Sequence, residues 1–270
     1  MKKRGISLLL KYVISNIYKG LSIMKLRMAA IALCLLFAPA FQASAAEKIL
    51  VAVAANFIEP FKEIAGRFHA GSGIEVEPTF SSTGKLYAQI TQGAPYDAFL
   101  SADEKRPREL FGKGLAGKPF VYATGEVVLW TSRKDLCGAA GWKEVLARGD
   151  VKRVSIANVE TAPYGTAAMD ALKKAGLWEG IQSRLVFPQD VAQSFQYAFT
   201  GSVDAGFCAL SAALSSQGAT GCRFAVEGAP DIVQEACVLS GSKHSQAAEK
   251  FAAFLLSPEA AGIKKKYGYK

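Results

Sequence analysis

The feature that most constrains the fold of this chain is a regular alternation of short apolar runs with amphipathic segments. The apolar runs Lys48–Ala54, Ile74–Phe80 and Tyr96–Ser101 are separated by stretches with apolar residues at helical spacing. Buried strands that alternate with helices are typical of a mostly parallel sheet covered on both faces, whose ligand sites lie at the carboxyl ends of the strands. The chain is therefore predicted to be α/β.

The same alternation starts afresh after a longer apolar strand, 126–131, and continues to a strand at 205–210. A last apolar strand, 235–240, is followed by two helices that lead to the C-terminus. If this tail packs on the first half, two strands cross between the halves at a hinge. We expect two lobes with a ligand cleft between them: lobe 1 comprises 46–126 and 236–270, and lobe 2 comprises 127–235.

Residues 1–45 have the pattern of a cleaved leader. Met24 starts a short basic segment that is followed by an apolar run, and Ala43-Ser44-Ala45 fits the small-x-small cleavage rule. We interpret residues 1–23 as an upstream extension, with Met24 as the alternative start. Cys34 lacks the small residue that a lipoprotein signal needs before it. An exported, soluble periplasmic protein is expected.

The net charge of +9 comes mainly from this leader, which contains basic residues and no acidic ones. After residue 45 the chain has 25 Lys and Arg against 23 Asp and Glu. This near balance argues against a nucleic acid or an anionic membrane as partner. No later stretch is long and apolar enough to span a bilayer.

Four cysteines follow the leader, an even number in a compartment that permits disulfides. Three pairings are open, and so is the alternative that the thiols are free and buried. No spacing matches a redox or zinc motif, so no bare metal cation is expected. The cysteines are Cys137, Cys208, Cys222 and Cys237.

Four junctions between a predicted strand and the next helix carry small, polar or Tyr-Gly residues. The first N–H groups of a helix lack intrahelical partners and carry the positive end of its dipole, so converging helix starts can bind an anion without Lys or Arg. Two junctions fall in each expected lobe, so an anion between them would draw the lobes together. The donors are the amide of Asn56, the hydroxyl and N–H groups of Ser82 and Thr83, and the backbone N–H groups of Tyr164 and Val191.

A pocket of donors alone selects among oxyanions. A fully deprotonated dianion such as molybdate or sulfate presents only acceptors, whereas phosphate carries a proton that would stay unpaired at a cost of roughly 1–3 kcal/mol. Asp190 is the nearby carboxylate, and its expected role is to cap its own helix. The simpler alternative for each polar residue is an ordinary helix cap, since Asn, Ser and Thr are common there.

Other candidate catalytic and phosphate-binding motifs in the sequence are incomplete. Ser82-Thr83-Gly84-Lys85 lacks the first Gly and the final hydroxyl residue of a phosphate-binding loop. The two histidines, His69 and His244, stand beside a helix-ending Gly and in a polar loop, where neither can serve a nucleophile. Asp97 and Asp103 flank a strand at opposite ends, so turn and cap roles are expected for them.

Several motifs occur in a fixed order along the chain. They are Val53-Ala54-Ala55-Asn56-Phe57, Phe80-Ser81-Ser82-Thr83-Gly84-Lys85-Leu86, the segment Gly93–Asp103, Ala162-Pro163-Tyr164-Gly165, and Lys266-Tyr267-Gly268-Tyr269. With these motifs the chain resembles the periplasmic molybdate-binding proteins of ABC transporters, from Lys48 to the C-terminus. The resemblance implies a type II periplasmic-binding-protein fold and a monomeric receptor, not an enzyme. It implies molybdate or tungstate as ligand, an inner-membrane ABC permease as partner, and no cofactor.

The resemblance also implies which residues hold the oxyanion. They are Asn56, Thr83, Tyr164 and Val191, with Ala55 and Ser82 as secondary neighbours. One departure is Ala209, which stands where several members have a ligand-contacting Tyr, and Asn56 is expected to supply the missing donor. A receptor for another oxyanion such as sulfate, or a secreted hydrolase that uses the same donors as an oxyanion hole, remain the alternatives.

Overall fold

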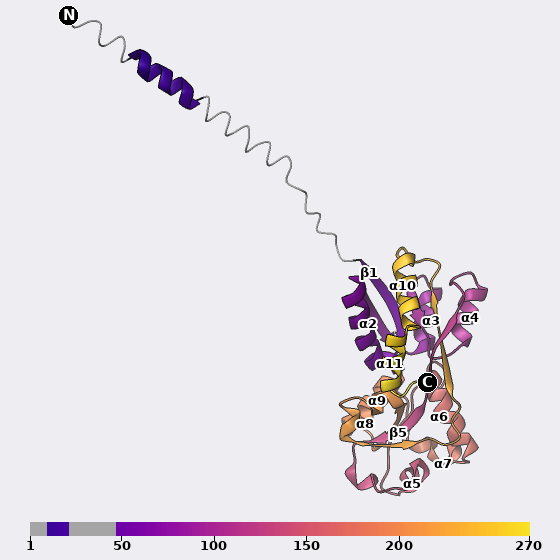
Figure 1. Ribbon diagram of the computed structural model, residues 1–270. Helices are drawn as coiled ribbons and strands as arrows, with labels where there is room; N and C mark the ends of the chain where they lie inside the picture. Colours follow the sequence, from indigo (N-terminus) through magenta and orange to yellow (C-terminus); the bar gives the residue numbers. More distant parts are fainter. Residues whose placement is uncertain (1–9, 22–46) are drawn as a thin grey trace, which may run out of the picture. The chain divides into compact units, whose positions relative to one another are not determined.

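The computed structural model describes residues 10–21 and 47–270 (Figure 1). Residues 10–21 form a helix within a unit, 1–45, that is separate from 46–270. The predicted apolar run and the cleavage site at Ala45 lie outside the described residues. Among the residues that the structure describes, no helix is long and apolar enough to cross a membrane.

Lobe 1 is built around a five-stranded sheet. β1 is parallel to β2 and β3, while β10 is antiparallel to β3 and β4. In spatial order the strands are β2 (Glu75–Ser81), β1 (Lys48–Ala54), β3 (Ala98–Leu100), β10 (Ile232–Val238) and β4 (Phe120–Gly125). The helices are α2 (Ile58–Ser72), α3 (Thr83–Thr91), α4 (Lys105–Gly112), α10 (Ser245–Leu255) and α11 (Pro258–Lys266).

Helices cover both faces of this sheet, because its strands are apolar on both sides. On one face Phe61 and Phe68 of α2 pack edge-on against Phe251 of α10. On the other face Leu86 of α3 and Leu110 of α4 are fully buried against the sheet. The early chain thus has the strand and helix order that its apolar periodicity predicts.

Lobe 2 has a second five-stranded sheet, in which β6 is parallel to β7 and β8, and β5 is antiparallel to β8 and β9. In spatial order the strands are β7 (Leu185–Val186), β6 (Val154–Ser155), β8 (Ala205–Ala209), β5 (Val127–Thr131) and β9 (Cys222–Ala225). The helices are α5 (Trp142–Ala147), α6 (Pro163–Lys174), α7 (Trp178–Ile181), α8 (Val191–Phe199) and α9 (Leu210–Ala213). The edge strand β9 was not predicted, because it is short and only half-buried.

The chain crosses between the lobes twice. β4 ends at Gly125 in the first sheet and β5 begins at Val127 in the second, and the return lies between Ala225 and Ile232. The boundary expected at residues 235/236 therefore lies inside β10. The prediction of a two-lobed α/β fold with two crossings is confirmed.

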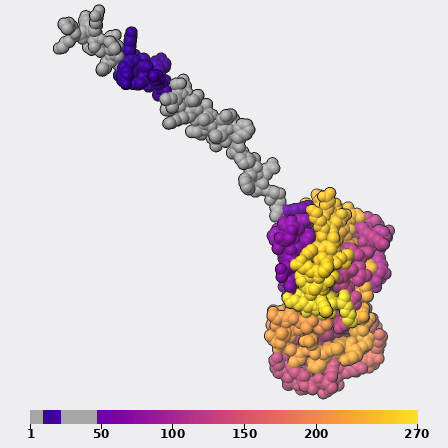
Figure 2. All heavy atoms as spheres, in the orientation of Figure 1, coloured from indigo at the N-terminus to yellow at the C-terminus, as the bar shows by residue number. Residues whose placement is uncertain are grey.

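The C-terminal segment lies on lobe 1 and reaches the boundary with lobe 2 (Figure 2). Its last residue is fixed by two backbone hydrogen bonds to β4, from Thr124 N–H to the Lys270 carbonyl and from Lys270 N–H to the Thr124 carbonyl. This docking places Tyr269 beside the hinge, where the side chain is buried.

The structure joins one pair of cysteines. Cys137, after a short turn that follows β5, is bonded to Cys222 at the start of β9, with Cα atoms 5.5 Å apart. Cys208 and Cys237 are free and buried in the two sheets. Burial raises the pKa of the Cys208 thiol well above its usual range and that of Cys237 to about 12.

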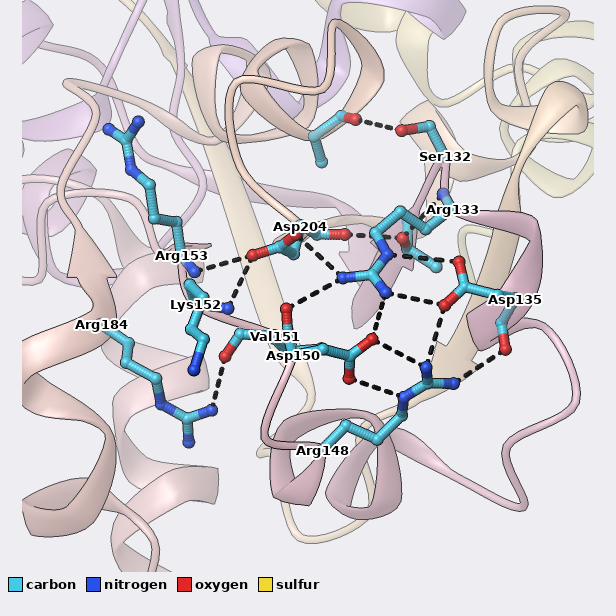
Figure 3. A network of polar contacts seen from close by, with 12 residues as sticks. Ser132, Arg133, Asp135, Arg148, Asp150, Val151, Lys152, Arg153, Arg184 and Asp204 are labelled. Carbon is cyan, nitrogen blue, oxygen red and sulfur yellow. Dashed lines mark hydrogen bonds and ion pairs between the residues drawn. The ribbon is translucent and has the colours of Figure 1, made fainter.

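A network of charged residues ties together three strands of lobe 2 at the edge where β6 and β8 begin (Figure 3). Arg133 donates to Asp204 over 3.0 Å, and its guanidinium also pairs with Asp135 and Asp150. Asp204 in turn accepts the backbone N–H groups that precede β6, those of residues 152 and 153, over 2.7 and 2.9 Å. The network therefore stabilises the end of the sheet opposite the carboxyl ends of these strands.

We predict that replacing the Cys137–Cys222 bond by Ser at both positions lowers the stability of the protein. The disulfide closes a loop with a sequence separation of 85 residues, for which chain entropy gives about 4–5 kcal/mol as an upper value. Thermal unfolding of the double variant and of the parent with and without reductant measures the effect. Equal melting temperatures would contradict the assignment of this pair.

We predict that Asp204→Asn destabilises the protein by roughly 1–3 kcal/mol at pH 7, because the carboxylate serves two backbone N–H groups and Arg133. Burial alone would raise the pKa of Asp204, but its bonds to Arg153 N–H, Lys152 N–H and Arg133 lower it below the usual value.

Because the folded pKa lies below the unfolded value of about 3.9, the ionised carboxylate stabilises the fold above that pH. Its contribution is lost as the pH falls through the folded pKa. Denaturant titrations at pH 7, 4 and 2.5 should show the gap between parent and variant narrowing with acidity. A gap that does not depend on pH would contradict this account.

Candidate functional site

A small cavity lies between the lobes where the four predicted junctions meet. All six residues singled out from the sequence line it, so the structure brings the predicted set together. Their role in holding a ligand stays a prediction. The lining residues are Ala54, Ala55, Asn56, Ser82, Thr83, Ala102, Ala162, Pro163, Tyr164, Asp190 and Val191.

Asn56 lies in the short turn Ala55–Phe57 that joins β1 to α2, and it is 4% exposed. The structure holds it firmly. Its Nδ2 donates to Gln234 Oε1 over 2.8 Å and to the Tyr269 hydroxyl over 3.0 Å. Its Oδ1 is buried without a hydrogen-bond partner in the protein. The side chain thus has one polar atom left over at the cavity wall.

The start of α3 presents two hydroxyls. Ser82 occupies the N-cap position, yet its side chain makes no capping bond, and its buried Oγ has no protein partner. Thr83 Oγ1 accepts the N–H of Ala102 over 3.0 Å. Because this bond uses a lone pair and leaves the hydroxyl proton, Thr83 can still donate to a ligand.

The start of α6 presents backbone donors. Pro163 opens the helix, and the N–H of Tyr164 is one of the first N–H groups, which have no intrahelical partner. A Cβ on the next residue, Gly165, would lie 2.1 Å from the Ala157 carbonyl oxygen. Only glycine therefore lets α6 approach the end of β6 so closely, which explains the Tyr-Gly pair.

The Tyr164 side chain points away from the cavity, toward the hinge. Its hydroxyl accepts a hydrogen bond from Gln234 Nε2 over 3.2 Å. Burial raises the pKa of Tyr164 well above its ordinary value, and the neighbouring Tyr269 raises it further. The hydroxyl is therefore neutral at any physiological pH.

At the start of α8, Asp190 is the N-cap, and its Oδ1 accepts the Gln193 N–H over 3.0 Å. The prediction that this carboxylate caps its own helix is confirmed. The Val191 N–H is the first of the helix and has no intrahelical partner. The capping bond leaves this backbone donor at the cavity wall.

No Lys, Arg or His lines the cavity. The remaining donors are hydroxyls and backbone N–H groups at three helix starts, which suit a ligand that presents only acceptors. Within residues 10–21 and 47–270 no cluster of His, Cys, Asp and Glu could hold a metal ion. Both histidines are exposed, as the sequence predicts.

The lobes touch across the mouth of the cavity. Gln189 donates its side-chain amide to Ser81 Oγ over 3.0 Å, and the Gly84 N–H donates to the Thr161 carbonyl over 2.8 Å. Arg106 donates to the Glu160 carbonyl over 3.2 Å. These contacts hold the lobes together through residues that do not line the cavity.

Sequence reasoning missed three residues that support the site: Gln234, Ser211 and Tyr269. Ser211 donates its hydroxyl to the Asn56 carbonyl over 2.7 Å, and the Tyr269 hydroxyl donates to the same oxygen over 2.8 Å. The only sequence signal for Gln234 is a polar residue within an apolar strand. Tyr269 is part of the C-terminal motif Lys266-Tyr267-Gly268-Tyr269, but the residues around it in the sequence do not indicate a contact with Asn56.

Ala209, the residue at the departure from the resembled family, is buried at the end of β8. It is not among the residues that line the cavity. Asn56 lines the cavity, but its Nδ2 donates to Gln234 and Tyr269, so the role expected of it as the missing donor stays a prediction.

The chain is similar to known proteins over nearly its whole length. Residues 49–270 match the family of bacterial extracellular solute-binding proteins. The molybdate-binding protein ModA of Rhodobacter capsulatus is 38% identical over 249 residues, which cover 90% of this chain and 96% of that protein. ModA of Azotobacter vinelandii is 39% identical over 232 residues, which cover 84% and 91%.

Solved structures of related proteins have the same fold. The periplasmic molybdate-binding protein of Azotobacter vinelandii superposes with a TM-score of 0.77 at 33% identity, over 82% of this chain and 98% of that one. The sulfate-binding protein SubI of Mycobacterium tuberculosis, at 15% identity and a TM-score of 0.68, shares the fold. The chain therefore belongs to the bacterial extracellular solute-binding proteins and, among them, to the ModA-type family.

Proposed function

We propose that the protein is a periplasmic receptor that binds molybdate between its lobes and delivers it to an ABC-type permease in the inner membrane. The observation that carries this proposal is the convergence of four strand-to-helix junctions on one cavity without a cation. The relatives named for molybdate binding at 38% and 39% identity support the choice of ligand.

The chemistry of the wall favours a dianion without protons. Thr83 and Ser82 offer hydroxyl protons, and the starts of α6 and α8 offer backbone N–H groups. The one carboxylate on the wall, Asp190, has an oxygen engaged by its own helix. The proton of a phosphate would have only the second Asp190 oxygen or Asn56 Oδ1 as acceptor, so we propose that phosphate binds more weakly than molybdate.

Tungstate has the same charge and shape as molybdate, so we propose that it binds as well. Sulfate is smaller, and donors spaced for molybdate would meet it at stretched distances. The sulfate-binding SubI shares the fold at only 15% identity, which leaves a sulfate receptor as the second candidate. A ligand series separates the two.

A hydrolase that uses the same donors as an oxyanion hole is the less favoured alternative. Such an enzyme needs a base within hydrogen-bond reach of a nucleophile. Both histidines are exposed, and His69 lies 3.2 Å from the Ile74 carbonyl at the end of α2, not at the cavity. We therefore propose a binding role without catalysis.

Export and delivery complete the proposal. The Cys137–Cys222 disulfide suits an oxidising compartment such as the periplasm. Two lobes that close on the anion change their common surface, and a permease can recognise that change. We propose that the receptor acts as a monomer, because one chain supplies all four junctions.

Calorimetric titration of residues 46–270, stripped of ligand, tests the function. We predict binding of molybdate and tungstate with one anion per chain and much weaker binding of sulfate and phosphate. Tight sulfate binding would support the second candidate. If none of the four anions bound, the cavity would not be an oxyanion site.

Replacing Thr83 by Ala tests the site. We predict that molybdate affinity falls roughly 10- to 100-fold, because a hydrogen bond to a charged ligand contributes about 1.5–3 kcal/mol. Asn56→Ala should cause a loss of similar size. Thr91→Ala is the matched control, since Thr91 ends the same helix and its hydroxyl bonds to the Ala88 carbonyl. Unchanged affinity in both site variants would refute the assignment.

A further inference from the structure

Asn56 belongs to a buried set of polar side chains that lies where the lobes join. All its members are at most 6% exposed, and they come from both lobes and from the hinge strand β10. Their hydrogen bonds run from one side chain to the next without a charged group. The members are Asn56, Tyr122, Tyr164, Ser211, Gln234 and Tyr269.

The directions of these bonds conflict at two places. The Tyr122 hydroxyl has one proton, yet it lies 3.0 Å from two acceptors, the Ser101 carbonyl and Gln234 Oε1. Gln234 Oε1 also receives the Asn56 amide, while Asn56 Oδ1 is buried without a partner. A buried acceptor that stays unpaired costs free energy.

The orientation of the Asn56 amide also conflicts with the binding of an anion. Asn56 Nδ2 is used on the protein side, by Gln234 and Tyr269. Because the two polar atoms of an amide lie on opposite sides of its carbon, the atom left for the cavity is Oδ1. An anion that presents only acceptors is repelled by such an oxygen.

Turning both amides over gives Tyr122 one acceptor and points the Asn56 NH₂ group at the cavity, and it requires Tyr269 to redirect its proton from the Asn56 carbonyl to Asn56 Oδ1. The oxygen and nitrogen of an amide have nearly the same shape, so a half-turn exchanges their positions and leaves the neighbouring distances in place. We propose that in the anion-bound receptor the Gln234 and Asn56 amides are turned over together, so that Gln234 positions Asn56 with its NH₂ group toward the anion. This inference rests on the proposed function, because it requires an anion in the cavity.

In the turned arrangement Asn56 Oδ1 lies beside the Tyr269 hydroxyl, in the place that Nδ2 holds now. Tyr269 then gives its one proton to Oδ1 and loses its bond to the Asn56 carbonyl, which keeps the proton of Ser211. Tyr122 donates to the Ser101 carbonyl, and Gln234 Nε2 donates to the Tyr122 oxygen and to Asn56 Oδ1. Gln234 Oε1 then accepts from the Tyr164 hydroxyl, which is 3.2 Å away in the present arrangement. The Asn56 NH₂ group is free for the ligand.

The hydrogen bond between Gln234 and Tyr164 joins the two lobes at the hinge. Tyr164 belongs to α6 of lobe 2, whereas Gln234 lies on β10 of lobe 1. A Cβ at Gly125, where the chain crosses, would lie 2.1 Å from the Tyr164 hydroxyl and 2.6 Å from Gln234 Nε2. Glycine at this crossing lets the two side chains meet, so Gln234 forms a hydrogen bond to lobe 2 through Tyr164.

Gln234→Met tests the proposal, since Met is close in size and has no strong donor or acceptor. We expect molybdate affinity to fall about tenfold, because Asn56 loses the donor that holds its oxygen away from the anion. Tyr122→Phe, which removes the group that orients Gln234, should lower affinity about threefold. Tyr96→Phe is the matched control, because the Tyr96 hydroxyl bonds to Gln89 on the surface of lobe 1.

Whether Gln234→Met weakens or strengthens molybdate binding distinguishes the two orientations of the amides. If Gln234 Oε1 held the Asn56 amide in the bound receptor, Gln234→Met would release Asn56 and leave molybdate binding unchanged or tighter. That outcome, with normal binding by the parent, overturns the amide inference alone. A parent that bound no oxyanion would overturn the proposed function and this inference with it.

Neutron diffraction of the deuterated molybdate complex gives a readout that a merely structural role for Gln234 would not produce. We expect two deuterons on the amide atom of Gln234 that faces Tyr122 and Asn56. We also expect two on the amide atom of Asn56 that faces the anion. Deuterons on the Asn56 atom that faces Gln234 would overturn the proposal, whether or not Gln234→Met folds stably.

Discussion

The site depends on the parallel pairing of β1 with its two neighbours. The register places Ala54 beside Ser81 and Val53 beside Leu100, so the three strands end along one edge of the sheet. The turn with Asn56 and the start of α3 follow at that edge, and Ala102 lies next to Thr83 there. A shift of one residue in this pairing would turn each side chain to the other face and separate the donors.

In lobe 2 the parallel strands β6 and β7 end side by side in the same way, and α6 and α8 follow them to the cavity. Gly165 allows α6 to touch the end of β6, and the charged network of Arg133 and Asp204 fastens the opposite edge. Charges therefore stabilise the part of the lobe remote from the ligand. The donors at the cavity are hydroxyls and backbone N–H groups, which favour an anion because their hydrogen bonds point toward it and not because they carry a net charge.

Much of this could be predicted from the sequence, because strands, helix starts and capping residues are local. The run Lys48–Ala54, the hydroxyls at Ser82 and Thr83 and the cap at Asp190 are each visible within a few residues. The pairing of Cys137 with Cys222 and the role of Gln234 could not be predicted, because they depend on contacts between distant segments. The edge strand β9 lacks the continuous apolar run that marks the buried strands.

Tyr269 contacts Asn56 across 213 residues of sequence. A site in which such a distant segment holds Asn56 is incomplete while only the early part of the chain has folded. During export the amino-terminal strands can pair and bury their apolar faces first, since these contacts are close in sequence. Capture of the anion then has to wait for the final helices to dock, so the ligand cannot act as a template for the first steps of folding.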